Sequence, residues 1–166
     1  MPSLRIDKEL KDSFYFVTCT VQNWYYIFDR HNRWEILAES LKYCQKHKGL
    51  NIFAYVFMLN HIHFIAQAPD MIRFLCDFKK FTSMQIMKNI LATEPDVAKL
   101  FPKKNGKFKI WEETNKPEII ETEKFFLQKM NYIHNNPVRK QYVQNPKHWY
   151  WSSVNPASPI SIQILE

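Results

Sequence analysis

The sequence predicts an α+β fold in which helices pack on one face of an antiparallel sheet. Two observations predict it: strand-like and helix-like segments alternate over the first 136 residues, and two strand-like segments are joined by a very short connection. Such a connection needs antiparallel strands, because parallel strands require a long crossover. Prolines concentrate after residue 136, which predicts an irregular tail.

The first predicted strand spans residues 13–21, "SFYFVTCTV", where aromatic and β-branched residues dominate. A helix follows, with Asn32 as candidate N-cap and Gly49 as the residue that can close it. Apolar residues recur at helical spacing between them, and the last turn is basic, as helix C-termini favour.

Two strands then follow, over residues 51–59 and 61–68, with a tight turn around Leu59–Asn60. Asparagine tolerates the turn conformation needed there. Because side chains alternate along a strand, His61 and His63 share one face of the second strand. The opposite face is apolar and predicted to be core: Ile62, Phe64, Ala66 and Ala68.

A second helix is predicted over residues 71–92, followed by a loop over 93–107 and a fourth strand over 108–113, "FKIWEE". Three phenylalanines are expected on one stripe of that helix: Phe74, Phe78 and Phe81.

A third helix is predicted from the cap residue Thr122 to Asn136, where Pro137 stops it. The order is therefore β-α-β-β-α-β, then a helix and a tail, which is the ferredoxin-like split βαβ arrangement. The two histidines would lie on the sheet face away from the helices. The helix's core stripe is expected to comprise Phe126, Met130 and Ile133.

The 166 residues are expected to form one domain, with a core over 13–136 and a tail over 137–166. A hydrophobic fraction of 46% supports a packed core. The chain has only two glycines, Gly49 and Gly106, so folds that need a glycine-rich phosphate loop are disfavoured.

The net charge of +7 suggests a polyanionic partner, or simply a basic protein kept soluble by its charge. Three widely spaced cysteines without a CxxC motif fit a reducing cytoplasm. The start, "MPSLRIDKEL", lacks the apolar core of an export signal, and no apolar run has transmembrane length. We therefore expect a cytoplasmic protein without membrane contact.

Four residues suggest a reaction centre. Tyr132 and Asn136 lie four apart on the third helix and share a face, at an expected position between core and solvent. If His61, His63 and Asn136 converge, two imidazoles and an amide oxygen form an open divalent-metal site. This site suits Mg²⁺ or Mn²⁺ and does not exclude Zn²⁺ or Co²⁺. Tyr132 would then be the nucleophile in a phosphodiester transesterification.

Each feature also has a plain structural interpretation. His-x-His on a strand can be a hydrogen-bonded pair, Tyr132 can be a packing residue, and Asn136 can simply end a helix before Pro137. A structural zinc protein is disfavoured, because there are only two histidine ligands and no suitably spaced cysteines.

The stretch "YVFMLNHIHFIA" resembles the His-hydrophobic-His (HUH) motif of the IS200/IS605-like tyrosine transposases. Residues 110–154 are similar to the C-terminal half of the REP-associated tyrosine transposase branch, in which Tyr-Ile-His-x-Asn-Pro-Val precedes a Pro-aromatic-Trp/Tyr-Ser-Ser tail. The resemblance spans about residues 13–154. Two departures, Leu59 in place of a common Pro and "RKQYV" in place of an Ala-Gly-containing stretch, affect turn shape and tail docking.

The resemblance implies a ferredoxin-like Y1 transposase domain that nicks and joins single-stranded DNA beside a hairpin. It implies His61 and His63 as metal ligands, Asn136 as the third ligand and Tyr132 as the nucleophile, with Mg²⁺ or Mn²⁺. Cleavage would leave a 5′-phosphotyrosine and a free 3′-hydroxyl. The alternative is a domesticated relative that binds hairpin DNA or structured RNA without strand transfer.

Basic residues offer candidate DNA contacts. In residues 99–111, lysines alternate with Phe101, Phe108 and Trp111, which could stack on unpaired bases, although the segment could also be a solvated basic loop. A homodimer paired through the first or fourth strand is a further possibility. The candidate DNA-binding residues are Lys79, Lys80, Lys103, Lys104, Lys107 and Arg139.

Overall fold

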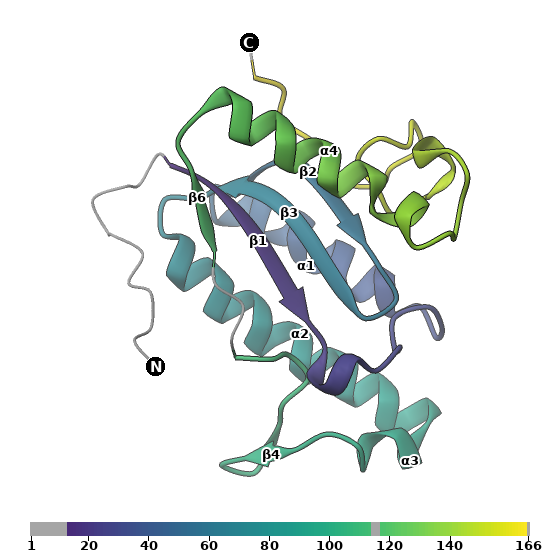
Figure 1. Ribbon diagram of the computed structural model, residues 1–166. Coiled ribbons are helices and arrows are strands. Elements are labelled where there is room, and N and C mark those ends of the chain that lie inside the picture. Colours follow the sequence, from purple (N-terminus) through teal and green to yellow (C-terminus); the bar gives the residue numbers. More distant parts are fainter. Residues whose placement is uncertain (1–12, 114–116, 166) are drawn as a thin grey trace.

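The computed structural model describes residues 13–113 and 117–165 (Figure 1). Its main sheet has the strand order β2-β3-β1-β6, and every neighbouring pair is antiparallel. This order confirms the ferredoxin-like α+β prediction. The start of the chain, on which the absence of an export signal was argued, lies outside the described residues. The four strands are β1 (Phe14–Thr20), β2 (Asn51–Phe57), β3 (His61–Gln67) and β6 (Glu118–Ile120).

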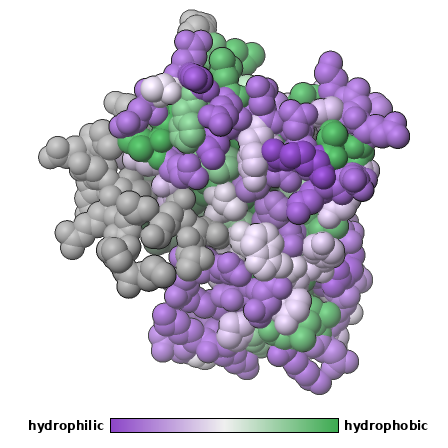
Figure 2. Space-filling model, in the orientation of Figure 1, coloured by the Kyte–Doolittle hydropathy of each residue, from purple (hydrophilic) through white to green (hydrophobic). Residues whose placement is uncertain are grey.

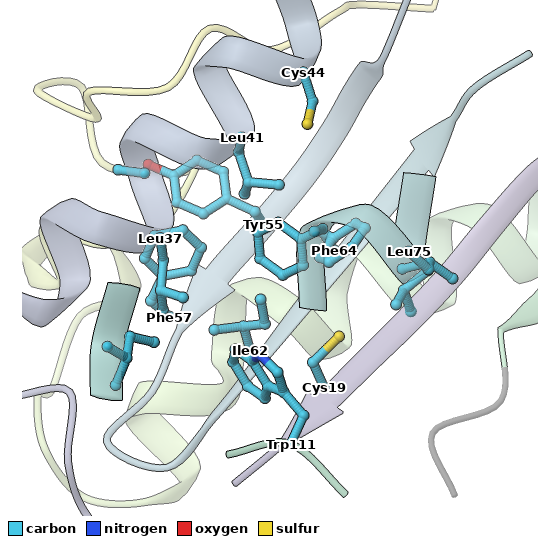
Figure 3. Close-up of a cluster of buried hydrophobic side chains, with 14 of the residues drawn as sticks. Cys19, Leu37, Leu41, Cys44, Tyr55, Phe57, Ile62, Phe64, Leu75 and Trp111 are labelled. Atoms are coloured by element: carbon cyan, nitrogen blue, oxygen red, sulfur yellow. The ribbon is translucent and has the colours of Figure 1, made fainter. Parts of the chain in front are cut away.

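Helices lie on both faces of this sheet. The long helices α1 (Arg33–His47) and α2 (Met71–Thr93) cover one face, and α4 (Glu123–Arg139) crosses the other (Figure 1). Each face has its own apolar cluster. The larger one joins α1 and α2 to the sheet, and Figure 3 shows Leu37 and Leu41 of α1 facing strand residues such as Phe57.

The α4 face holds the second cluster. Phe126 and Ile133 are buried there with Met130 packed beside them, which confirms the predicted stripe. Ile65 belongs to this cluster, whereas Ile62 and Phe64 belong to the other, so the predicted alternation of β3 is also confirmed. The face that carries the histidines is therefore covered by a helix over much of its area.

The turn between β2 and β3 is tight, as predicted, with the Met58 amide donating to the His61 carbonyl at 2.8 Å. The reason given for Asn60 is wrong, because Asn60 is not among the residues with positive φ. Its side chain instead forms hydrogen bonds with the Trp24 carbonyl and with His61 Nδ1. Asn32 does occupy the N-cap of α1, but its backbone is left-handed and its side chain caps nothing.

Phe74 and Phe78 are buried, but Phe81 is 46% exposed, so its predicted core position is wrong. The buried stripe of α2 continues through Thr82 and Ile86, which follow Phe78 in steps of four residues. Phe81 lies beside this stripe rather than on it.

The predicted fourth strand over residues 108–113 is also wrong. That segment reaches the end of β1 through a single bridge between Val21 and Trp111, and β6 occupies the fourth position in the sheet. Ile110 and Trp111 are buried and supply the apolar pattern that suggested a strand.

Residues 103–108 form a separate two-stranded hairpin, β4 (Lys103–Lys104) with β5 (Lys107–Phe108). Short helical turns complete the chain: η1 (Gln22–Trp24), α3 (Pro95–Ala98) and η2 (Pro146–His148).

Pro137 does not stop α4, which continues to Arg139. A proline near the last turn removes one intrahelical hydrogen bond, and Pro137 is nevertheless accommodated there as a buried residue. The following tail holds one short element, η2, as predicted.

The tail covers the outer edge of β2. The Phe57 amide donates to the Trp151 carbonyl at 2.8 Å, and the Ser153 amide donates to the Tyr55 carbonyl at 3.0 Å. β1 pairs on both sides and residues 108–113 are not a strand of this sheet, so neither suggested edge is correct; the edge is formed by β6 instead. Of the two sheet edges, only that of β6 is left without backbone pairing by the described residues.

Hydrophilic residues predominate on the α4 side of the molecule, and hydrophobic residues gather only in separate patches there (Figure 2). Within the described residues, no helix combines the length and apolar character needed to span a bilayer.

Candidate active site

His61 and His63 lie side by side near the start of β3, with ring centroids 4.8 Å apart. Both are almost fully buried, so each imidazole must have polar partners. The antiparallel register places Thr18 of β1 directly opposite His63. Thr18 Oγ1 lies 2.9 Å from His63 Nδ1, which fixes that ring from the neighbouring strand.

Asn60 fixes the second ring. Its Nδ2 donates to the Trp24 carbonyl at 3.1 Å, and its Oδ1 lies 2.7 Å from His61 Nδ1. Because a carbonyl only accepts, the amide nitrogen must face Trp24 and the amide oxygen must face His61. In neutral His61 the proton is therefore on Nδ1 and the lone pair is on Nε2.

The pKa of both histidines lies below its usual range. Burial lowers the pKa of His61 to about 4, with a further contribution from the charge of Lys140. Burial also lowers the pKa of His63 well below its ordinary value, helped by His61, Arg139 and Lys129. Both imidazoles are neutral at neutral pH, which is the form that binds metals.

Helix α4 brings Tyr132 to the same place. The Tyr132 ring meets His63 edge-on, 5.3 Å between centroids, and it meets Phe16 of β1 in the same manner at 5.9 Å. Tyr132 is 38% exposed, which agrees with the predicted position between core and solvent. The tyrosine thus reaches the histidine pair of its own chain.

Asn136 lies one turn further along α4 and is only 3% exposed, so its predicted half-exposed position is wrong. Tyr132, four residues before it, meets the His63 ring edge-on. Because residues four apart share a helix face, Asn136 lies on the same face of α4 as Tyr132.

These donors fit a divalent cation. In both histidines Nδ1 is held by a neighbouring oxygen, as is usual for metal-binding imidazoles, and no hydrogen bond from the described residues occupies Nε2. The Asn136 amide oxygen is a suitable third donor. No cluster of three histidine, cysteine or acidic side chains occurs among the described residues, so an amide would have to complete this set.

Two cations flank Tyr132. The guanidinium carbon of Arg139 lies 4.1 Å from the centroid of the Tyr132 ring, and the ammonium of Lys129 lies 5.6 Å from it. Lys129 also lies 4.3 Å from the ring centroid of Phe16 and pairs with Glu118 of β6 at 3.5 Å. Two positive charges therefore lie against the exposed Tyr132 ring.

His134 is close to Tyr132 in sequence but faces elsewhere. Its Nε2 lies 2.8 Å from Ser153 Oγ, and Ser153 in turn bonds the backbone of Tyr55 in β2. His134 therefore fastens the tail to the sheet and is not placed to act on Tyr132.

The candidate DNA-binding lysines lie on the other side of the sheet. Four of the five border a groove of about 1560 Å³ between α1, α2 and residues 104–113. Lys79 and Lys80 lie on its α2 side, and Lys104 and Lys107 lie on its hairpin side. Lys103 stacks on the Phe108 ring at 4.6 Å. Arg139 alone of the six candidates lies beside Tyr132.

The predicted stacking role of Phe101 and Trp111 is wrong. Both rings are buried, and the Trp111 indole donates to Thr82 Oγ1 at 2.9 Å inside the core. Phe108 alone of the three remains partly accessible.

Sequence reasoning missed Thr18, Asn60 and Lys129. The pairing of Thr18 with His63 would have followed from aligning the first strand antiparallel to the third, residue by residue. Asn60 directly precedes His61 and was interpreted only as a turn residue. Nothing in the sequence signals Lys129, because its contact with Phe16 depends on how α4 crosses the sheet.

Comparison with known proteins adds to this geometry. No family model matches the chain. An uncharacterized protein of Haemophilus influenzae is 25% identical over 146 residues, covering 76% of this chain and 81% of that one. A solved structure of a REP-associated tyrosine transposase bound to a REP hairpin superposes with a TM-score of 0.68. That superposition covers 87% of this chain and 78% of the transposase at 18% identity. The chain shares the fold of that transposase.

Proposed function

We propose that the protein is a metal-dependent single-stranded DNA endonuclease and strand transferase. The observation that carries the proposal is the position of Tyr132, whose ring lies 5.3 Å from that of His63, between two cations and beside the histidine pair. Tyr132 would supply the nucleophile, and the neutral imidazoles of His61 and His63 with Asn136, one helical turn from Tyr132, would supply the metal donors. The transposase fold of the hairpin-bound relative supports DNA as the substrate.

In the proposed reaction, Tyr132 Oη attacks the phosphorus of a phosphodiester. The new bond joins Oη to phosphorus, and the bond from phosphorus to the 3′-oxygen breaks. The phenol proton passes to water, and the departing 3′-oxygen gains a proton to become a 3′-hydroxyl. The product is a 5′-phosphotyrosine, which a 3′-hydroxyl can attack in the reverse sense to rejoin strands.

His61, His63 and Asn136 would hold Mg²⁺ or Mn²⁺. When bound, the cation would polarise a phosphoryl oxygen and orient the phosphate. The protein's own contribution is to fix both rings through Thr18 and Asn60 and to hold Tyr132 over His63. Arg139 and Lys129 would stabilise the negative charge that develops on the phosphate.

The lysine-bordered groove would bind the hairpin. Its volume exceeds that of most small-ligand pockets, and its lysines lie on two opposing walls. Lysines on both sides of a groove can neutralise phosphates of a helical stem. We propose that the groove binds DNA at a distance from the cleavage centre.

The experiment incubates the full-length protein with labelled single-stranded DNA that carries a hairpin from the flanks of its own gene. Mg²⁺ or Mn²⁺ is supplied, and a denaturing gel reports covalent adduct. We expect an adduct with the wild type and with Tyr150→Phe, and none with Tyr132→Phe. Tyr150 is a suitable control because it is also exposed and lies in the tail. Retarded DNA without adduct, for several hairpins and both metals, would favour the binding-only alternative.

A further inference from the structure

Trp24 lies at the rim of the candidate active site with its ring largely in solvent. It is 58% exposed, whereas the other four tryptophans are buried or half-buried. Its ring meets His61 edge-on at 6.1 Å between centroids. Single exposed apolar side chains are common, but this ring lies against a buried histidine and leaves its other face open to solvent.

The backbone that presents Trp24 is strained. Asn23 and Trp24 have φ values of 53° and 59°, in the left-handed region that a bulky residue seldom adopts. Such strain persists only when surrounding contacts enforce it, and it concentrates at functional sites. Here the Trp24 amide donates to the Val21 carbonyl at 3.0 Å, which closes the short turn η1.

Asn60 joins this strained turn to the candidate metal site. One end of its amide holds the Trp24 carbonyl and the other holds His61 Nδ1. The position of Trp24 is thus coupled to the ring expected to bind the metal. A ring carried on a backbone held in this way can place a substrate group at a defined distance from the reacting phosphate.

We propose that Trp24 is the stacking platform for an unpaired nucleobase next to the scissile phosphate. The exposed indole face suits any base, since stacking needs only a π surface. This subsite takes the role that Phe101 and Trp111 cannot fill. It rests on the proposed function and specifies which part of the DNA the site recognises.

The test uses 2-aminopurine, whose fluorescence falls when it stacks on an aromatic ring. The base is placed in turn at each unpaired position flanking the hairpin, in a Tyr132→Phe background that leaves the strand intact. We expect quenching at one or two adjacent positions on binding. Trp24→Asn should abolish it and weaken binding of the single-stranded flank about tenfold, whereas hairpin binding stays unchanged.

Two matched variants sharpen the result. Trp24→Phe keeps a smaller aromatic face and should retain part of the quenching, and Tyr150→Leu removes an exposed aromatic ring elsewhere and should retain all of it. Because asparagine accepts a left-handed backbone, Trp24→Asn should melt no lower than the wild type. Absence of quenching at every position, or quenching that survives Trp24→Asn, would overturn the subsite. The fluorescence needs no cleavage, so loss of adduct formation alone would count only against the endonuclease.

Discussion

Arg139 lies over the ring of Tyr132, with its guanidinium carbon 4.1 Å from the ring centroid, and its Nη2 donates a 3.1 Å hydrogen bond to the Tyr132 carbonyl. One side chain therefore contacts both the ring and the backbone of the candidate nucleophile. The sequence suggested Arg139 only as a DNA contact. The geometry gives it a role in orienting Tyr132 as well.

Replacing Arg139 should therefore slow the covalent step more than it weakens DNA binding. We expect Arg139→Gln to reduce the rate of adduct formation about tenfold, because it removes a cation–π contact and a charge-assisted hydrogen bond. Arg139→Lys should recover little, because lysine lacks the planar face. Single-turnover gels give the rate, and fluorescence anisotropy gives the affinity. Lys124→Gln, an exposed change on the first turn of α4, is the control. Equal losses in rate and affinity would instead mark Arg139 as a DNA contact alone.

The proposed ligands should bind Mn²⁺ without DNA. We expect His63→Gln and Asn136→Ala to weaken Mn²⁺ binding by more than tenfold, and Asn60→Ala to weaken it about tenfold by releasing the His61 ring. Electron paramagnetic resonance of free Mn²⁺ measures this directly. His134→Gln is the matched control, since His134 bonds the tail and not the site. Removing metal with EDTA should abolish adduct formation in the wild type. Unchanged Mn²⁺ affinity in Asn136→Ala would exclude the amide as a ligand.

Much of this arrangement could be predicted from the chain, because local patterns governed it. Alternation along β3 placed His61 and His63 on one face, and the four-residue spacing placed Tyr132 and Asn136 together on α4. The predictions failed where packing between distant segments determines the conformation of a residue. Trp111 has the apolar neighbours of a strand residue, yet its side chain is core and its backbone makes one bridge.

Proline and asparagine illustrate the same limit. Pro137 favours a helix stop, but burial in the tertiary structure carries α4 two residues past it. Asn60 indicated a turn, whereas its structural value is the pair of hydrogen bonds that joins Trp24 to His61. The burial of Pro137 and the bond from Asn60 to Trp24 cannot be derived from residues near these positions in the sequence, since both depend on other segments of the chain.

Glu94 should be important for stability. Its carboxylate accepts from the fully buried Arg33 at 2.6 Å and from Arg30 at 2.8 Å. Glu94→Gln would leave the Arg33 charge with neutral partners only, so we expect it to lower the free energy of unfolding by about 2–3 kcal/mol. Glu39→Gln, which breaks an exposed pair with Lys42, should cost less than about 0.5 kcal/mol. Chemical denaturation at neutral pH measures both. Equal effects would show that the Glu94 pair is no stronger than a surface pair.

The same glutamate predicts a dependence of stability on pH. Its hydrogen bond from Arg30, and then that from Arg33, hold the pKa of Glu94 below its ordinary value. The folded state thus favours the ionised carboxylate of Glu94. The stability that this carboxylate contributes is fully present above the ordinary glutamate pKa and is lost as the pH falls through the lowered pKa of the folded state. We expect the stability difference between wild type and Glu94→Gln to shrink on acidification below the ordinary glutamate range. A difference that stays constant through that range would contradict this linkage.

The lysine groove should determine the salt dependence of hairpin binding. Lys80 and Lys107 line its two walls, and neither forms an ion pair with an acidic side chain among the described residues, so both charges are free to meet phosphates. Replacing both with Gln should weaken hairpin binding at low salt and reduce the slope of log K against log salt concentration by about 2.

Lys46→Gln with Lys124→Gln removes the same charge outside the groove and should leave the slope near that of the wild type. Because adduct formation depends on the other face of the sheet, the groove variant should still cleave at saturating DNA. Identical slopes in the two double variants would mean that the groove lysines contact no phosphate and that the hairpin binds elsewhere.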